Sequence, residues 1–182
     1  MDTIKTAGVV VLTVCFGFGV VQTVCALSEE DFQQVGARYG VSPYLLQAIA
    51  AVESRNGTLL GTHIVSDVVN ATQLKFLKKI ARNTERAISE FTGSPAGAMG
   101  YMQIMPSTFY MYAQDGDGDG IRDPLDPHDS LATAAYFLAR TMAIKNTLRA
   151  TLRKYNNSNI YCDKVIALYN QLESESRVAL SK

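Results

Sequence analysis

Apolar residues recur at helical spacing in separate segments of the chain, and most of these segments begin or end at a recognisable signal. Between residues 42 and 56, Ser42 can cap a helix, Pro43 suits its first position, and Asn56-Gly57 ends it. A second, longer helix is predicted over residues 74–91, and its other face is rich in Lys and Arg.

The second half of the chain continues the helical pattern. Pro106 opens a short helix through Tyr112, Asp129 can cap a helix that reaches Met142, and Ser158 begins the last helix. No segment alternates convincingly as a β-strand does. The pattern therefore predicts an all-α domain, with functional segments at helix ends and in the loops between helices.

The first 26 residues differ from the rest. Lys5 precedes an apolar run over residues 7–21, and small or neutral residues follow at 24–26. This is the layout of a secretory signal with cleavage after Ala26. An uncleaved N-terminal membrane anchor is the alternative, because the apolar stretch is barely long enough to span a bilayer. Both readings predict a secreted, periplasmic or cell-envelope protein, with one domain over residues 27–182.

Composition narrows the function classes. The 182 residues suffice for one domain with a real core. The 17 basic and 17 acidic residues give zero net charge, so nothing indicates nucleic-acid binding. Past the leader, Cys162 is the only cysteine. It cannot form an internal disulfide and is predicted to be a small core residue.

Glu53 is the strongest candidate for acid–base chemistry. It lies at the end of the first predicted helix, on one stripe with Leu46 and Ala50. A carboxyl group among apolar side chains loses hydration when it is charged, so its pKa should rise, as a general acid near neutral pH requires. An ordinary exposed glutamate is the alternative for this segment taken by itself.

Two loop segments combine polar groups with small or aromatic residues. In residues 97–107, glycines permit close backbone approach, and Gln103 offers both a donor and an acceptor. In residues 155–161, aromatic rings alternate with amides, which suits sugars, whose faces are apolar and whose rims are polar. The alternative for residues 97–107 is a glycine-containing connection, and the alternative for residues 155–161 is a turn with a helix cap.

The acidic, glycine-rich stretch over residues 115–126 has the spacing of a twelve-residue, EF-hand-like calcium loop. Its aspartates would repel one another without a cation. Asp at the twelfth position, in place of the usual bidentate Glu, indicates weak affinity or an altered coordination number. An acidic turn stabilised by its glycines is the alternative. The predicted ligands are Asp115, Asp117, Asp119, the carbonyl of Ile121, Asp123 and Asp126.

These four segments, in this order, resemble the lytic murein transglycosylases, in particular the membrane-bound transglycosylase B family, which cleaves the glycan of bacterial peptidoglycan. Glu53-Ser54 looks like the catalytic pair of that superfamily, residues 94–107 look like the B-family signature, and the calcium loop is a B-family feature. The similarity runs from about Tyr44 to Leu168. It implies a lysozyme-like helical enzyme with a structural Ca²⁺, no organic cofactor and a monomeric state.

The resemblance also implies roles for individual residues. Glu53 is the implied catalytic acid/base. Lys78 and Lys79 lie where the family has basic residues facing peptidoglycan carboxylates, and a solvated helix face is their alternative. The chain departs from the family in its short length, which implies fewer glycan subsites. It also has Phe137 where the family is expected to have a tyrosine, and the neighbouring Tyr136 is the alternative source of that aromatic hydroxyl. The other implied substrate contacts are Ser54, Ser94, Tyr101, Gln103, Tyr155, Asn156 and Tyr161.

The implied reaction needs a single carboxyl group. Most glycosidases use two carboxyl groups, but substrate-assisted exceptions use one. The nearest other acidic residue in sequence is Asp67, and a helix cap or a surface residue is its simpler interpretation. Glu53 would cleave the MurNAc–GlcNAc β-1,4 bond of glycan strands and leave 1,6-anhydromuramyl ends. A hydrolytic lysozyme of the same fold and a noncatalytic, calcium-dependent wall-binding module are the alternatives.

Overall fold

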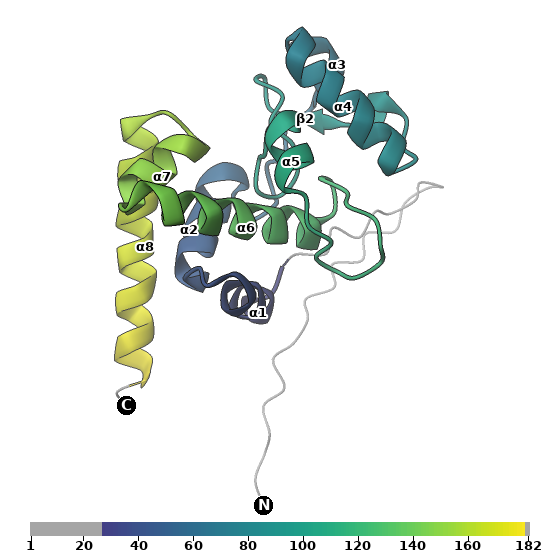
Figure 1. The fold of residues 1–182 in the computed structure, drawn as a ribbon. Coiled ribbons are helices and arrows are strands. Elements are labelled where there is room, and N and C mark those ends of the chain that lie inside the picture. Colours follow the sequence, from purple (N-terminus) through teal and green to yellow (C-terminus); the bar gives the residue numbers. More distant parts are fainter. Residues whose placement is uncertain (1–26, 181–182) are drawn as a thin grey trace, which may run out of the picture.

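The computed structural model describes residues 27–180 of the chain (Figure 1). The predicted signal peptide or anchor therefore lies outside the described residues. Within residues 27–180, no helix is both long enough and apolar enough to cross a membrane.

Helices dominate the described residues, which confirms the predicted all-α class. Two strands of two residues each, β1 (His63–Ile64) and β2 (Thr92–Gly93), pair antiparallel with Ile64 opposite Thr92. Strands this short show no alternation, so the pattern could not reveal them. The helices are α1 (Glu29–Tyr39), α2 (Pro43–Ser54), α3 (Val65–Val68), α4 (Ala71–Asn83), the 3₁₀-helix η1 (Ile88–Glu90), α5 (Pro106–Tyr112), α6 (Pro127–Lys145), α7 (Leu148–Tyr155) and α8 (Asn159–Leu180).

Local signals explain where α1 and α2 begin and end. Ser28 and Asp31 form a capping box at the start of α1, in which each side chain accepts a hydrogen bond from the other residue's backbone N–H. Helix α2 begins at Pro43, as predicted, and ends where Arg55 takes a left-handed conformation with φ of 49°. The last residues of α2 are therefore Glu53 and Ser54.

Two helix boundaries differ from the sequence prediction. Helix α4 ends at Asn83, whereas the apolar spacing predicted a helix to residue 91. The Thr84 hydroxyl donates to the Ile80 carbonyl, and Glu85 is left-handed, with φ of 55°. The buried Phe91 therefore reaches the core after η1 instead of on a continuous helix. Helix α6 begins earlier than predicted, because Asp126 caps it instead of Asp129.

Helix α2 lies against α8 over much of its length, and α6 packs against α1, α5 and α7. Figure 1 shows α3 and α4 in a separate part of the molecule, joined to the rest through α5. One core of buried apolar side chains runs through these elements. Because α7 and α8 meet beside α2, residues more than a hundred positions apart in sequence come together at the end of α2.

The loop before α5 is tied to the start of α6. Met99 and Ile104 exchange backbone hydrogen bonds of 3.0 and 2.9 Å, and the Met102 N–H donates to the Ser130 hydroxyl at 3.0 Å. Gly100 has φ of +70°, and a Cβ there would lie 1.9 Å from the Pro124 carbonyl oxygen. The glycine is therefore needed both for its conformation and for the close approach of the two segments.

Replacing Gly100 by alanine should lower the free energy of unfolding by about 2–4 kcal/mol, because the new Cβ forces the loop away from Pro124. Gly40→Ala is the matched control, since Gly40 has φ of +68° but no atom within 4 Å of its Cβ position. It should cost only about 1 kcal/mol. Urea denaturation of both variants measures the difference, and equal losses would contradict the steric argument.

Candidate active site

Glu53 lies in the last turn of α2, and the residue after it holds that turn in place. The Ser54 side chain is fully buried; its hydroxyl donates to the Ala50 carbonyl at 3.3 Å and accepts from the Gly57 N–H at 2.8 Å. Both partners of Ser54 are backbone groups. Ser54 thus positions the end of α2, and its buried hydroxyl has no free face for a sugar.

Two tyrosines from different helices lie beside Glu53. Tyr161 in α8 stacks on Tyr155 at the end of α7, with ring centroids 6.5 Å apart and an interplanar angle of 8°. The Tyr155 hydroxyl donates to the Met102 carbonyl at 2.6 Å, which ties α7 to the loop before α5. Phe137 of α6 packs edge-on against Tyr155 with centroids 5.7 Å apart. Aromatic rings therefore form one wall of the Glu53 site.

This apolar wall changes the acidity of Glu53. Burial raises the pKa of Glu53 from 4.5 to about 7, and the neighbouring Tyr161 hydroxyl opposes part of that rise. Burial, reinforced by the Glu53 charge, raises the pKa values of Tyr155 and Tyr161. Near neutral pH, both the acid and the carboxylate form of Glu53 are therefore populated. A group that must donate a proton and later accept one needs both forms.

Gln103 occupies a strained position close to the tyrosine wall. Its φ is 48°, and its side-chain N–H₂ donates to the carbonyls of Leu60 and Gly100 at 3.1 and 2.9 Å. Its side chain lines a small cavity of about 40 Å³ together with Phe137 and Tyr155. With both donors used by the backbone, the amide oxygen of Gln103 is the group oriented to accept a hydrogen bond from a ligand.

The other predicted substrate contacts have different surroundings. The Ser94 hydroxyl accepts from the Ala98 N–H at 3.1 Å, within the turn after β2. Tyr101 is only 3% exposed and packs against Phe32, so it is chiefly a packing residue. Its ring also lies over Gly57. Asn156 is exposed at the end of α7 and remains accessible to a ligand.

Lys78 and Lys79 lie on α4, away from the elements that carry Glu53 and the two tyrosines. Lys78 is exposed. The Lys79 ammonium group lies 4.7 Å from the ring centroid of Tyr110 and 5.7 Å from that of Phe76, so it makes cation–π contacts. These contacts hold Lys79 on the α4–α5 surface.

Phe137, not Tyr136, meets the tyrosine wall. The Tyr136 ring packs against Tyr39 and Tyr112, with centroids 5.9 and 6.2 Å away, on the side of α6 that faces α1 and the end of α5. Phe137 is buried between Tyr112 and Tyr155. Tyr136 therefore does not supply a hydroxyl in place of Phe137.

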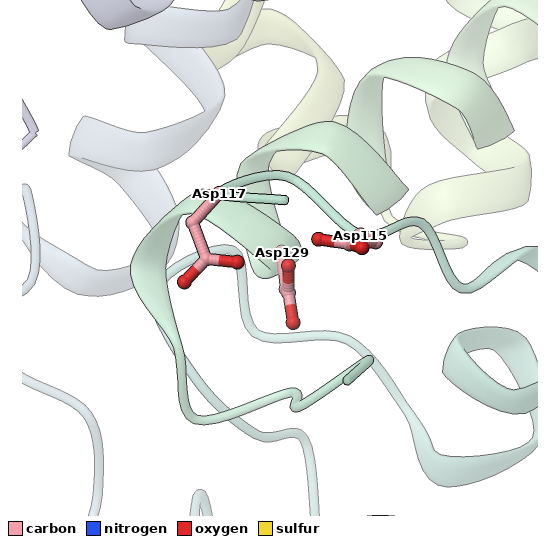
Figure 2. Close-up of side chains that lie close together, drawn as sticks. All are labelled: Asp115, Asp117 and Asp129. Atoms are coloured by element: carbon pink, nitrogen blue, oxygen red, sulfur yellow. The ribbon is translucent and has the colours of Figure 1, made fainter. Parts of the chain in front are cut away.

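The acidic loop gathers three carboxylates at the start of α6. Asp115, Asp117 and Asp129 each offer an oxygen within 4.8 Å of the others (Figure 2). Asp129 is buried, and its carboxylate accepts from the N–H groups of Gly116 and Asp123, both at 2.6 Å. Burial and the nearby acidic groups raise the pKa of Asp129 to about 6, against those two hydrogen bonds. A bound cation would relieve the crowding of these charges.

The carboxylates that lie together differ from the predicted ligand set: Asp129 was not part of that set, and two of its aspartates have other partners. The Asp126 carboxylate accepts from the N–H groups of His128 and Asp129 as the N-cap of α6. Asp123 pairs with the Arg86 guanidinium at 2.5 Å and accepts from the Leu125 N–H. Asp119 and Ile121 lie on the exposed part of the loop. In the sequence, the available signal for Asp129 was that an acidic residue stands three positions after the twelfth residue of the loop.

Glu53→Gln should stabilise the protein at alkaline pH. The pKa of Glu53 is higher in the folded than in the unfolded state, so folding favours its protonated form, and stability is lost as pH rises from about 4.5 to about 7. Removing the charge should therefore raise the free energy of unfolding by roughly 1–3 kcal/mol at about pH 8. Below about pH 4 the two proteins should be equally stable. Denaturant titrations at both pH values test this, and a destabilised variant at the higher pH would contradict it.

Comparison with known proteins places the chain among the transglycosylases. The family model described as the transglycosylase SLT domain matches residues 22–146. The membrane-bound lytic murein transglycosylase B of Escherichia coli K12 is 33% identical over 125 residues, which are 61% of this chain and 35% of that protein. The chain thus spans about a third of the length of this curated relative.

Solved structures share the fold. The E. coli lytic transglycosylase Slt35, in complex with calcium, superposes with a TM-score of 0.73 at 22% identity, covering 82% of this chain and 72% of that one. Pseudomonas aeruginosa SltB3, in complex with NAG-anhNAM-pentapeptide, gives 0.68 at 23% identity, covering 79% and 60%. The helical fold is therefore lysozyme-like, as predicted. Since the family model covers more than half of the chain, this protein belongs to the transglycosylase SLT domain family.

Proposed function

We propose that this protein is a peptidoglycan lytic transglycosylase that uses Glu53 as its single acid/base. The observation that carries the proposal is the setting of the Glu53 carboxyl group, which is half-buried beside Tyr161 with its pKa raised to about 7. Among residues 27–180, burial and the Tyr161 hydroxyl are the causes of this shift, and no carboxylate is among them. A retaining or inverting glycosidase would place a second carboxylate within about 5–10 Å.

The first step breaks the bond between C1 of the muramic acid residue and the glycosidic oxygen. Protonated Glu53 gives its proton to that oxygen, which departs with the bonding electron pair as the 4-hydroxyl of the next sugar. The N-acetyl carbonyl oxygen of the same muramic acid residue stabilises the positive charge at C1, which substitutes for the missing protein nucleophile. Glu53 is left as a carboxylate.

The second step returns Glu53 to its starting state. The carboxylate takes the proton of the C6 hydroxyl while the C6 oxygen attacks C1, which closes the 1,6-anhydro ring. The acid form of Glu53 is regenerated, and no water is consumed. A pKa near 7 suits both proton transfers, because neither the acid nor the base form is strongly disfavoured at neutral pH.

The residues around Glu53 would bind the sugars. The exposed Asn156 and the amide oxygen of Gln103 offer hydrogen-bonding groups beside the tyrosine wall, whose ring faces suit the apolar faces of sugars. The Ser94 hydroxyl, which is partly exposed, would contact polar groups of the glycan. Lys78 and Lys79, on α4, would face carboxylates of the peptidoglycan peptides.

The substrate is proposed to be peptidoglycan glycan strands, met outside the cytoplasm by an exported, monomeric protein. The E. coli relative is a murein transglycosylase named as membrane-bound, and the SltB3 complexes hold disaccharide pentapeptides. Residues 1–26 would direct the export of the chain, as a cleaved signal or as an anchor to the membrane.

Digestion of purified peptidoglycan distinguishes this function from its competitors. The wild type should release muropeptides with anhydro ends, which are lighter by one water than the products of a hydrolytic lysozyme. Glu53→Gln should lower the rate by at least about a hundredfold, because it removes the proton donor. Mass spectrometry of the digests measures the mass of the products and, over time, the amount released.

Asp67→Asn is the matched control for this digest, because Asp67 is the acidic residue nearest in sequence and is exposed on α3. Its rate should equal that of the wild type. Hydrolysed products would identify a lysozyme instead, and a wild-type effect on cell walls that persists in Glu53→Gln would identify a binding module.

We also propose that the acidic cluster at the start of α6 holds a structural Ca²⁺. Ca²⁺ binds six to eight oxygen ligands. Asp115, Asp117 and Asp129 would supply three carboxylates, and Asp119 and the Ile121 carbonyl, in the same loop, would supply further oxygens. The Slt35 structure contains calcium. Bound there, the ion would neutralise the crowded charges and fix the loop against α6, without taking part in the proton transfers.

Calcium should raise the melting temperature of the wild type, and chelation should lower it while the folded fraction stays active. Asp129→Asn should abolish this calcium response, because it removes the buried carboxylate of the cluster. Asp126→Asn is the control, since asparagine caps a helix as well as aspartate does. Thermal denaturation with and without calcium measures both. If Asp126→Asn, and not Asp129→Asn, lost the response, the twelve-residue count would be correct.

A further inference from the structure

A second cavity, the α4–α5 cavity, opens between α4, α5 and the loop that precedes α6. Helices α4 and α5 pack side by side (Figure 1). The volume of the cavity is about 240 Å³. Pockets that hold whole small-molecule ligands measure about 300–1,000 Å³, so this cavity fits the end of a chain better than a sugar with its substituents. It is lined by Ile80, Asn83, Phe109, Tyr110, Ala113 and Arg122.

The floor of the α4–α5 cavity is apolar and its rim is polar. Ile80 and Phe109 are buried, whereas Asn83, Tyr110 and Arg122 are exposed. Within residues 27–180, the Asn83 amide, the Tyr110 hydroxyl and the Arg122 guanidinium make no hydrogen bond or ion pair. All three groups can donate hydrogen bonds, and the planar fork of a guanidinium matches the two oxygens of a carboxylate. The rim therefore gathers unused donors around one positive charge.

The charges around the α4–α5 cavity favour an anion. The Lys79 ammonium group lies 4.7 Å from the centroid of the Tyr110 ring, so a second positive charge stands beside the rim. No acidic side chain of residues 27–180 lines the cavity. The acid that follows Arg122 in sequence, Asp123, pairs with Arg86 at 2.5 Å instead. A carboxylate bound at the rim would therefore meet two cations and no competing acid.

The α4–α5 cavity lies within reach of a substrate bound at Glu53. Gln103, beside the tyrosine wall, stands just before α5, and Tyr110 lies on that helix. Even if the chain between them were extended up to Pro106, Gln103 and Tyr110 would lie no more than about 17 Å apart. An extended peptide of five residues spans about the same length. The last residue of a stem that leaves a sugar beside Gln103 can therefore enter the cavity.

We propose that the α4–α5 cavity binds the C-terminal carboxylate of a peptide stem carried by the glycan. This inference rests on the proposed function. Arg122 pairs with the carboxylate, Asn83 and the Tyr110 hydroxyl donate further hydrogen bonds to it, and the apolar floor contacts the small side chain of the last residue. The contact strengthens the binding of stems that end in a free carboxylate, and it takes no part in the proton transfers.

Removing the carboxylate from the ligand tests the proposal without altering the protein. NAG-anhNAM-pentapeptide is a product of the proposed reaction and cannot be cleaved further, so titration calorimetry can measure its dissociation constant with the wild type. The same molecule with a C-terminal amide should bind roughly five- to twentyfold more weakly, as expected for loss of a partly exposed, bidentate ion pair. Equal binding of the acid and the amide would overturn the proposal.

Arg122→Gln should bind the acid as weakly as the wild type binds the amide, and it should no longer distinguish the two ligands. Arg82→Gln is the matched control, because Arg82 is exposed on α4 and carries the same charge but does not line the cavity. It should keep the wild-type preference for the acid. A preference that survives in Arg122→Gln, or an equal loss of preference in both variants, would contradict a local site.

The digest of purified peptidoglycan separates the failure of this inference from that of the proposed function. If the wild type releases no anhydro ends, the proposed function fails and the inference fails with it. If the wild type releases anhydro ends but binds the acid and the amide equally, the inference alone fails.

Discussion

The carboxyl group of Glu53 must be partly removed from water and still be held in one orientation, and the other residues of the site serve these two requirements. Burial raises its pKa to about 7, close to the condition in which it can both donate and accept a proton. Orientation comes from the end of α2, where the buried Ser54 hydroxyl bonds two backbone groups. Among residues 27–180, Tyr161 is the polar neighbour that lowers the pKa of Glu53.

Helix packing brings the residues of this site together within a small domain. The contact of α2 with α8 brings Tyr161 to Glu53, and the hydrogen bond from Tyr155 to Met102 ties α7 to the loop that carries Gln103. At the far side of that loop, Gly100 meets Pro124 just before α6, whose first turn carries Asp129. The acidic cluster and the residues around Glu53 thus contact one loop from its two sides, which links the stability of the proposed calcium-binding segment to the geometry of the proposed active site.

Periodicity and capping rules predicted α2, α5, α6 and α8, because these helices carry apolar stripes between clear signals. Helix α4 was predicted too long, since Phe91 continues its apolar spacing although it reaches the core after a separate turn. The apolar neighbours of Glu53 made it a candidate, with an ordinary exposed glutamate as the alternative, and the family resemblance implied its catalytic role. Asp129 was missed because a fixed count of twelve cannot show how the loop closes. The placement of Tyr161 beside Glu53 depends on how α8 packs against α2, which no local pattern encodes. The sugar contacts and the role of residues 1–26 stay predictions.

The titration of the Glu53 side chain itself tests this account most directly. Carbon-13 NMR of the protein labelled at glutamate carboxyl carbons, with Glu53→Gln used to assign the signal, follows that group without any substrate. Glu53 should titrate with a midpoint at about 7, well above 4.5, the ordinary value for a glutamate. A midpoint near 4.5 would show a solvated carboxylate at the end of α2, and it would contradict the acid/base role on which the proposed mechanism depends.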